Sequence, residues 1–128
     1  MIRVAVGIIR DEGKFVLVKR DEQGRFPGLW EFPGGAADEG VTLEDALKDH
    51  LSKRFNLDVV VQDKLATVTQ EYDFGTVEIT AFGVECISKK VRLAHHLSYR
   101  WVRWNQFKEF DCVPSITPML EILKSQGL

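Results

Sequence analysis

The chain has 128 residues, of which 45% are hydrophobic and 28% are charged, and its formal net charge is −2. This length suits one compact domain over residues 1–128, and the composition excludes a disordered chain. The small negative charge predicts no strong attraction to nucleic acid. No apolar run approaches the ~18 residues that span a membrane, so no membrane partner is predicted.

The first third of the chain predicts three strands. Residues Arg3–Arg10 are rich in Val and Ile and predict a buried strand, and the alternating segment Lys14–Arg20 predicts its hairpin partner. Residues Leu29–Phe32 predict a short aromatic strand. We expect it to stop at Pro33–Gly35, a hinge whose backbone only glycines adopt at low cost.

A helix is predicted over Thr42–Phe55, with Thr42 as its N-cap and Asp45 three residues further on. Asn56 is suited to a left-handed cap at the other end. Helical spacing indicates one buried stripe, formed by Leu43, Ala46, Leu47, Leu51 and Phe55.

The second half of the chain predicts three more strands, a short helical turn near Asn105–Phe107 and a last helix over Pro114–Lys124 that Ser115 could cap. The strands are Leu57–Thr69, Thr76–Ser88 and Tyr99–Trp104. This order predicts an α/β (α+β) fold, an α/β/α sandwich with a mixed β-sheet between helices.

The heptapeptide Leu29–Gly35, LWEFPGG, resembles the start of the Nudix box of MutT-like nucleotide pyrophosphohydrolases. The same register extends along the chain, since Tyr99–Val102 resembles the family's late YRWV strand and Pro114–Pro118 opens the last helix. The resemblance implies a Nudix fold and cleavage of a pyrophosphate by water, with Mg²⁺ or Mn²⁺ held by carboxylates. Since no signal peptide or membrane span is visible, we expect a cytoplasmic location.

The box of that family runs G-x5-E-x7-R-E-U-x-E-E-x-G-U, where U is a bulky apolar residue. With Gly35 as its first glycine, the structural positions match, because Leu51 and Leu57 are apolar and Asn56 is an acceptable cap. The chemical positions differ: Val41 stands at the first Glu, Asp49 at the Arg, His50 at the next Glu, and Lys53 and Arg54 at the Glu-Glu pair.

These differences predict a degenerate active site that binds no metal in the usual place. Positions 50, 53 and 54 share one helical face, where three carboxylates would hold a divalent cation. Here they are a histidine and two cations. Unit charges about 4 Å apart at an effective dielectric of ~20 interact by ~4 kcal/mol. Each replacement of a carboxylate by a cation therefore turns an attraction of that size for a metal ion into a repulsion.

Two other segments depart from the family in the same sense. The stretch His95–Trp101 resembles the family's E-H-s-E-y-r-W segment, and Ser98 takes the place of its second Glu. His95 and His96 are interpreted as surface residues, because neighbouring strand residues point to opposite faces. The Asn with which MutT recognises purines falls on Ile116.

Two functions remain open at this point. The first is a non-hydrolytic module that needs no cofactor and binds a nucleotide, another diphosphate-containing small molecule or a protein partner. Lys53 and Arg54 would replace the metal's charge, and Trp30 could stack on a base. The candidate ligand-binding residues are Arg25, Trp30, Gly34, Gly35, His50, Lys53 and Arg54.

The second is a Nudix hydrolase of nucleoside diphosphate-linked compounds that binds Mg²⁺ or Mn²⁺ through displaced acids, for which Glu39, Glu44 and Asp45 are the candidates. Against it, Glu44 with Lys48 and Asp49 with Lys53 have i, i+4 spacing and can pair on the helix surface. The sequence leaves the oligomeric state open, a homodimer included.

Overall fold

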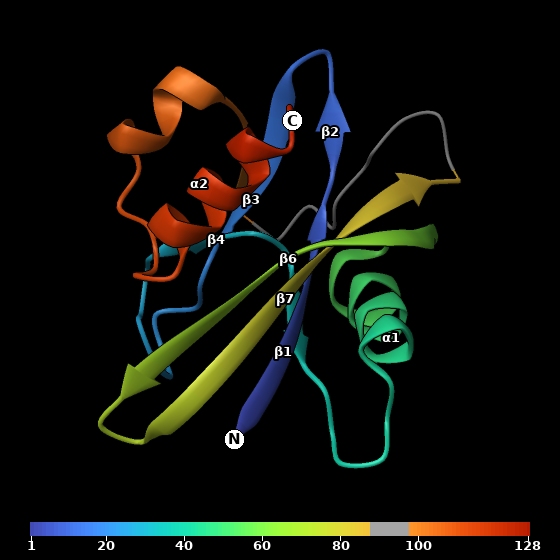
Figure 1. Cartoon of the computed structure of the whole chain (residues 1–128), viewed down its shortest axis with the longest axis vertical. Coiled ribbons are helices and arrows are strands. Elements are labelled where there is room, and N and C mark those ends of the chain that lie inside the picture. Colours follow the sequence, from blue (N-terminus) through green and yellow to red (C-terminus); the bar gives the residue numbers. More distant parts are fainter. Residues whose placement is uncertain (88–97) are drawn as a thin grey trace.

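The computed structural model describes residues 1–87 and 98–128. Its strands form two sheets that lie between helix α1 (Leu43–Phe55) and helix α2 (Ile116–Ser125), as Figure 1 shows. The predicted α/β architecture with helices on both sides of a mixed sheet is confirmed. No helix among the described residues is long and apolar enough to cross a membrane.

The first sheet is mixed, with strand order β5–β1–β7–β6. Strand β1 (Ile2–Ile8) runs parallel to β7 (Gly75–Cys86) and antiparallel to β5 (Gly34–Ala36). Strand β6 (Val59–Tyr72) pairs with β7 in a long antiparallel hairpin. This hairpin corresponds to the two strands predicted on either side of residues 70–75.

The second sheet is antiparallel and was not predicted as a separate unit. Its central strand is β3 (Lys14–Lys19), which pairs with β2 (Arg10–Asp11) and β4 (Trp30–Glu31) and also with β8 (Tyr99–Arg103). The predicted hairpin of the first two strands therefore spans both sheets, because β1 pairs within one sheet and β3 within the other.

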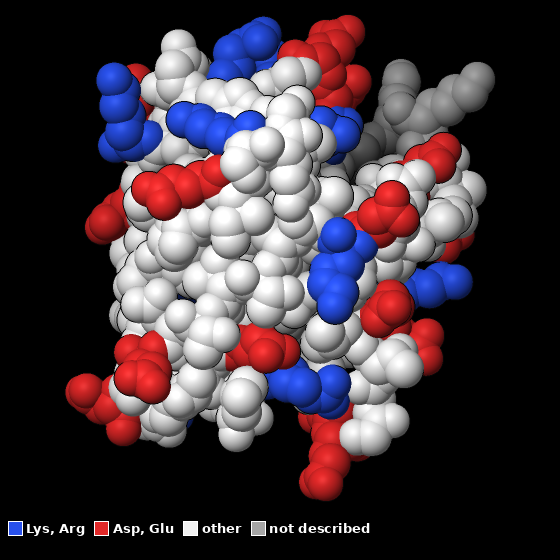
Figure 2. Space-filling model, viewed as in Figure 1, with Lys and Arg blue, Asp and Glu red and all other residues white. Residues whose placement is uncertain are grey.

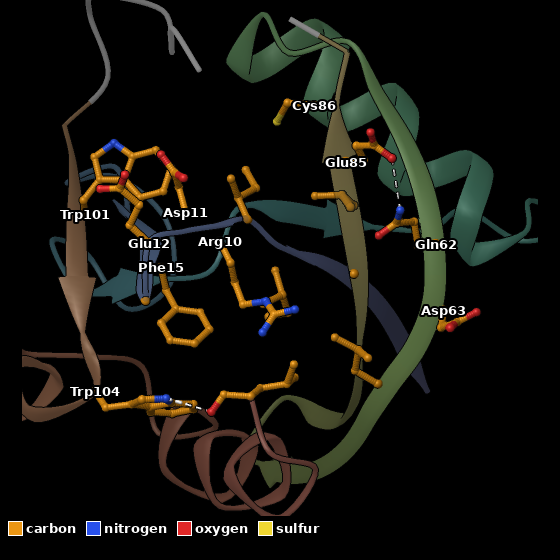
Figure 3. Close-up of a pocket in the computed structure, with 17 residues that line it drawn as sticks. Arg10, Asp11, Glu12, Phe15, Gln62, Asp63, Glu85, Cys86, Trp101 and Trp104 are labelled. Atoms are coloured by element: carbon orange, nitrogen blue, oxygen red, sulfur yellow. Dashed lines mark hydrogen bonds between the residues drawn. The ribbon is translucent and has the colours of Figure 1, made fainter. Parts of the chain in front are cut away.

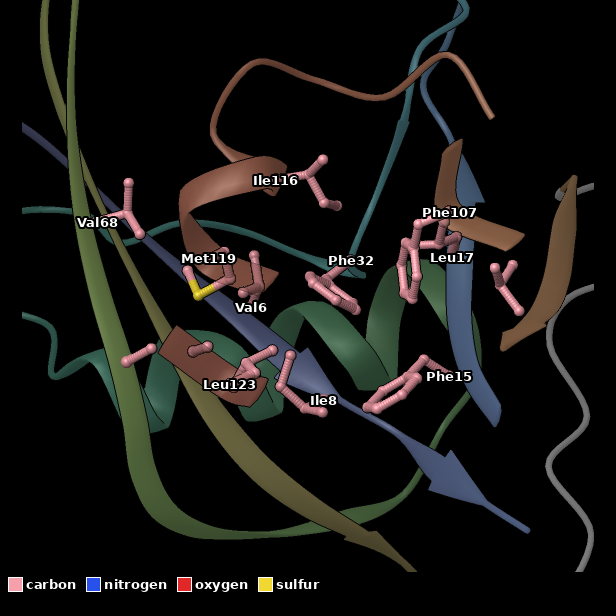
Figure 4. Packing of buried hydrophobic residues seen from close by; sticks show 13 residues of the cluster. Val6, Ile8, Phe15, Leu17, Phe32, Val68, Phe107, Ile116, Met119 and Leu123 are labelled. Carbon is pink, nitrogen blue, oxygen red and sulfur yellow. The ribbon is translucent and has the colours of Figure 1, made fainter. Parts of the chain in front are cut away.

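Side chains that alternate along β1 and β3 fill two separate cores. Val6 and Ile8 of β1 and Phe15 and Leu17 of β3 pack on the α2 side, together with Met119 of that helix (Figure 4). The residues between them on the same strands face the α1 side. That second core contains Ala5, Val16, Val18, Leu47, Leu51 and Phe55. The period of two in a strand thus supplies both layers of the sandwich.

Helix α1 begins and ends with the predicted caps. The Thr42 hydroxyl accepts a hydrogen bond from the Asp45 backbone N–H at 3.1 Å. Asn56 adopts the left-handed conformation, with φ 57° and ψ 38°, and its N–H donates to the Leu51 carbonyl. The predicted stripe is buried except for Leu43, which is half-buried.

The third strand ends before Pro33 as predicted, since β4 covers Trp30–Glu31, but the predicted glycine hinge is wrong because Gly34 to Ala36 form strand β5 of the first sheet. Neither Gly34 nor Gly35 has a positive φ. Gly34 instead allows close approach of two backbones, since a Cβ there would lie 2.0 Å from the Ala5 carbonyl oxygen. The requirement for glycine is therefore steric and comes from β1.

The end of the chain differs from its prediction in detail. A 3₁₀ helix, η1 (Trp104–Glu109), contains the predicted turn, and α2 starts at Ile116 instead of Pro114. Ser115 precedes α2, but its side chain makes no capping hydrogen bond and its backbone is already helical. Its predicted role as a cap is therefore wrong.

The left-handed Asn56 offers a direct test of the α1 boundary. Replacement by Ala should lower the free energy of unfolding by about 1 kcal/mol, because a residue with a Cβ but no polar side chain disfavours the left-handed conformation. Replacement by Gly should leave stability unchanged or raise it slightly. Urea unfolding of the three proteins measures the difference, and equal losses in both variants would contradict the assignment.

Candidate functional site

Two side chains of α1 bind the free edge of β5. The guanidinium of Arg54 donates from Nη1 to the Gly34 carbonyl oxygen at 2.6 Å. The Nε2 atom of His50 lies 2.6 Å from the Ala36 carbonyl oxygen. Because a carbonyl only accepts, this imidazole nitrogen carries a proton. The β5 edge is thus satisfied by two donors from the helix.

Gly35 lies between these two contacts and makes room for the imidazole. A Cβ at this position would lie 2.7 Å from the His50 ring, closer than real Cβ atoms approach. The predicted ligand residues Gly34 and Gly35 therefore each have a packing reason, the first toward β1 and the second toward α1. Any ligand at β5 approaches bare backbone.

Lys53 occupies the solvent side of the same helix. Its ammonium lies 3.0 Å from Asp49 Oδ1, and its side chain is 76% exposed. The predicted i, i+4 pair is therefore formed, whereas Glu44 and Lys48 form no ion pair. An exposed pair of this kind contributes little to stability, so Lys53 remains available to an anionic ligand.

A second charged pair, between Arg20 and Glu31, links β4 to the loop that follows β3. The Arg20 guanidinium binds both carboxylate oxygens of Glu31, at 2.9 and 3.0 Å, and its Nε donates to the Arg25 carbonyl oxygen at 2.8 Å. Burial raises the pKa of the Glu31 carboxyl above its ordinary value, and the positive charges of Arg20 and Arg54 oppose this rise.

The loop of residues 21–28 meets the tip of the β6–β7 hairpin. The Arg25 guanidinium lies over the Phe74 ring, 3.5 Å from its centroid. Phe74 stacks on Tyr72, whose ring is 5.1 Å from that of Phe26. The left side of Figure 1 shows the loop beside the tip of this hairpin, so the contact joins the two sheets.

These elements enclose a cleft of about 870 Å³. Its floor and rim hold five basic residues and three acidic ones, although the whole chain is negative. The basic residues are Lys19, Arg20, Arg25, Lys53 and Arg54, and the acidic ones are Asp21, Glu22 and Glu31. A deeper wall from β1, β7 and α2 is apolar and includes Val4, Ile79 and Met119. The cleft therefore suits an anion.

The other candidates lie away from this cleft. Trp30 packs edge-on against Phe110, with ring centroids 5.2 Å apart, and does not line the cleft. Glu39, Glu44 and Asp45 are exposed in the loop before α1 and in its first turn. Within residues 1–87 and 98–128, no three His, Cys, Asp or Glu side chains form a group that could hold a metal. His95 and His96 lie outside the described residues.

A second cavity, of about 1070 Å³, opens beyond the other end of β1. Figure 3 shows Arg10 projecting into it, with Trp101 and Trp104 on one side and Gln62 and Glu85 on the other. None of the predicted site residues lines it. On the face drawn in Figure 2, basic and acidic side chains are interspersed, without a large area of one sign.

A mixed sheet and an antiparallel sheet between two helices, with the PGG segment leading from the second sheet to the first helix, form a Nudix-type fold. The family profile described as "NUDIX domain" matches residues 4–124. The chain therefore belongs to the NUDIX domain family.

Individual relatives agree with this assignment. A CTP pyrophosphohydrolase of Escherichia coli (strain K12) is 26% identical over 94% of this chain and 90% of its own length. The solved MutT protein of Methanosarcina mazei Go1 has a TM-score of 0.85 at 22% identity and covers 98% of this chain and 94% of that chain. MutT from methicillin-resistant Staphylococcus aureus 252, titled a Nudix hydrolase, has a TM-score of 0.75 at 30% identity, over 97% and 96% of the two chains.

Sequence reasoning missed the Arg20–Glu31 pair and the aromatic contacts of Phe26, Tyr72 and Phe74. One signal for the pair was present, because Glu31 interrupts an otherwise apolar aromatic strand and a charge there needs a partner. A signal for the aromatic contacts was the spacing of Tyr72 and Phe74 in a hairpin turn, where large apolar residues are unusual.

Glu31 gives the site a pH dependence of definite sign. Since its pKa in the folded chain lies above the ordinary 4.5, the folded state binds the proton more tightly than the unfolded state. The free energy of unfolding should therefore fall as pH rises from about 4.5 through the pKa of Glu31. Urea unfolding as a function of pH should show this slope in the parent and lose it in Glu31→Gln. An opposite slope would show that Arg20 outweighs burial.

Proposed function

We propose that this NUDIX domain binds a diphosphate-containing small molecule, such as a nucleotide, through its own cations and does not hydrolyse it. The observation that carries the proposal is the pair of hydrogen bonds from Arg54 and His50 to the carbonyl oxygens of Gly34 and Ala36. Donors from α1 stand at positions where the family pattern has carboxylates.

The hydrogen bonding of these carbonyls supports a site that binds its ligand without a divalent metal ion. Carbonyl and carboxylate oxygens are both acceptors, so a Glu at position 50 or 54 would need a cation between it and β5. Arg54 and His50 supply protons themselves, so the edge of β5 needs no cation. The side chains at these positions do not suit Mg²⁺ or Mn²⁺, which prefer anionic oxygen ligands.

The distribution of charge supports an anionic ligand. Arg54 uses one nitrogen for Gly34 and keeps further N–H groups, because a guanidinium has five donors. Lys53 adds a mobile ammonium at the rim, and Arg25 faces the cleft from the opposite loop. Charge-assisted contacts to phosphate contribute roughly 1.5–3 kcal/mol each when partly desolvated.

Binding without metal is the first test. Calorimetry in EDTA should detect binding of inorganic diphosphate and of ADP to the parent protein. The change Lys53→Glu/Arg54→Glu should weaken both by about two orders of magnitude, since two charge-assisted contacts are lost and ~1.4 kcal/mol corresponds to tenfold. Affinity should also fall as salt rises.

A matched control separates a local effect from a change in net charge. Lys48→Glu/Lys64→Glu makes the same charge change at exposed positions that do not line the cleft, and it should bind like the parent. Thermal unfolding of both variants shows whether loss of the Arg54 contact has altered folding. No binding to the parent, or equal binding to the Lys53/Arg54 variant, would refute the proposal and favour a protein partner.

The similarity to a CTP pyrophosphohydrolase and to a MutT Nudix hydrolase supports the alternative, a metal-dependent hydrolase, in which Glu39, Glu44 or Asp45 would supply the acids. We expect release of phosphate or diphosphate to stay at background with nucleoside triphosphates, nucleotide sugars and dinucleoside polyphosphates at millimolar Mg²⁺ or Mn²⁺. Turnover that disappears in Glu44→Gln or Glu39→Gln would establish the enzyme instead.

A further inference from the structure

Three aromatic side chains form a cluster at the mouth of the basic cleft. Phe26 belongs to the 21–28 loop, and Tyr72 and Phe74 belong to the tip of the β6–β7 hairpin. The Tyr72 and Phe74 rings are stacked, with centroids 5.0 Å apart and planes at 11°. Phe74 is 39% exposed. The ring is therefore accessible to a ligand at the mouth of the cleft.

The Arg25 guanidinium lies over the Phe74 ring at 3.5 Å. Tyr72 is stacked on the same ring, so a guanidinium and an aromatic ring both cover Phe74. The guanidinium is planar and has the size of a small flat group, so the face that it covers suits another flat ring. Arg25 also lines the cleft and thus contacts both the cluster and the site proposed for a diphosphate.

The loop that carries Arg25 is held in an unusual conformation. Phe26 has a φ of +52°, which disfavours a bulky side chain. Arg20, fixed by Glu31, donates to the Arg25 carbonyl oxygen at 2.8 Å. The surroundings therefore keep Arg25 and Phe26 against the hairpin tip at a conformational cost, and strain of this kind concentrates at ligand sites.

We propose that the face of Phe74 covered by Arg25 is the stacking site for the base of a nucleotide. This inference rests on the proposed function, because the nucleotide's diphosphate binds in the basic cleft. A bidentate contact between Arg25 and phosphate oxygens is stronger than an exposed cation–π contact, so the diphosphate draws the guanidinium off the ring. The base then takes its place.

The deeper part of the cleft does not suit a base edge. Of Val113, Ser115, Ile116 and Met119, which line it at the start of α2, only Ser115 is polar. A base buried there would leave most of its polar groups without partners. On Phe74 the base edge stays in water, and every base has a π-face. Recognition should therefore depend on stacking, with purines bound somewhat more tightly than pyrimidines.

The test compares ADP with inorganic diphosphate in EDTA. Phe74→Leu keeps an apolar side chain but removes the ring, and it should weaken ADP binding about five- to tenfold. Binding of inorganic diphosphate should stay unchanged or tighten slightly, because Arg25 is released. Phe74→Tyr retains the ring and should stay within about twofold of the parent. Adenine proton resonances should shift upfield on binding to the parent and to Phe74→Tyr only.

Val60→Ala is the matched control, because it removes an exposed apolar side chain from the far end of the same hairpin and should bind both ligands like the parent. Equal losses for both ligands in Phe74→Leu would show that the ring only holds Arg25 and would overturn the inference. No loss for ADP would overturn it too. A parent that binds ADP but not inorganic diphosphate would refute the proposed function, while the ADP loss in Phe74→Leu would still support stacking.

Discussion

The carbonyl oxygens at the free edge of β5 set the position of α1, and the cleft depends on that position. They point away from β1 because carbonyls alternate along an edge strand, and Gly34 lets β5 approach β1 more closely than any residue with a Cβ allows. Arg54 and His50 then bind these oxygens, and Gly35 leaves room for the imidazole. Strands β1 and β5, the two glycines and helix α1 therefore pack as one unit, and a larger side chain at either glycine would displace its neighbours.

The same unit explains why the charged positions of the helix differ from the family pattern together. A hydrogen-bond acceptor at position 50 or 54 needs a cation between it and the β5 carbonyls, whereas a donor binds these carbonyls directly. The side chains at both positions are therefore expected to be acceptors together or donors together. Position 49 follows, since Asp49 pairs with Lys53 at 3.0 Å and reverses the sign of both partners relative to the family's Arg and Glu. The donors and the Asp49–Lys53 pair on this face are therefore consistent with one another.

Local signals in the sequence were sufficient for α1 and for most strands. Thr42, Asn56 and the alternation on β3 are decided by residues within a few positions of each other, and each was predicted. Strand β5 was missed because its Gly34 is required by the close approach of the β1 backbone, which is distant in the sequence. The Arg20–Glu31 pair and the contact of Phe26 with Tyr72 were missed for the same reason, since the partners meet only after the two sheets are assembled. Trp30 shows the converse, because an aromatic residue on a strand has no local signal that separates packing from stacking on a ligand.

Arg20 connects strand β4 with the 21–28 loop, a contact that short-range sequence patterns do not predict. Its guanidinium holds the buried Glu31 carboxylate of β4 and the backbone of the loop that presents Arg25. The rim of the cleft is therefore built by one ion pair in the second sheet, helix α1 and the tip of the β6–β7 hairpin, and Arg25 contacts this tip at Phe74. A ligand that engages both Arg54 and Phe74 would bridge helix α1 and the β6–β7 hairpin, which gives a diphosphate linked to a flat ring more contact than either fragment alone.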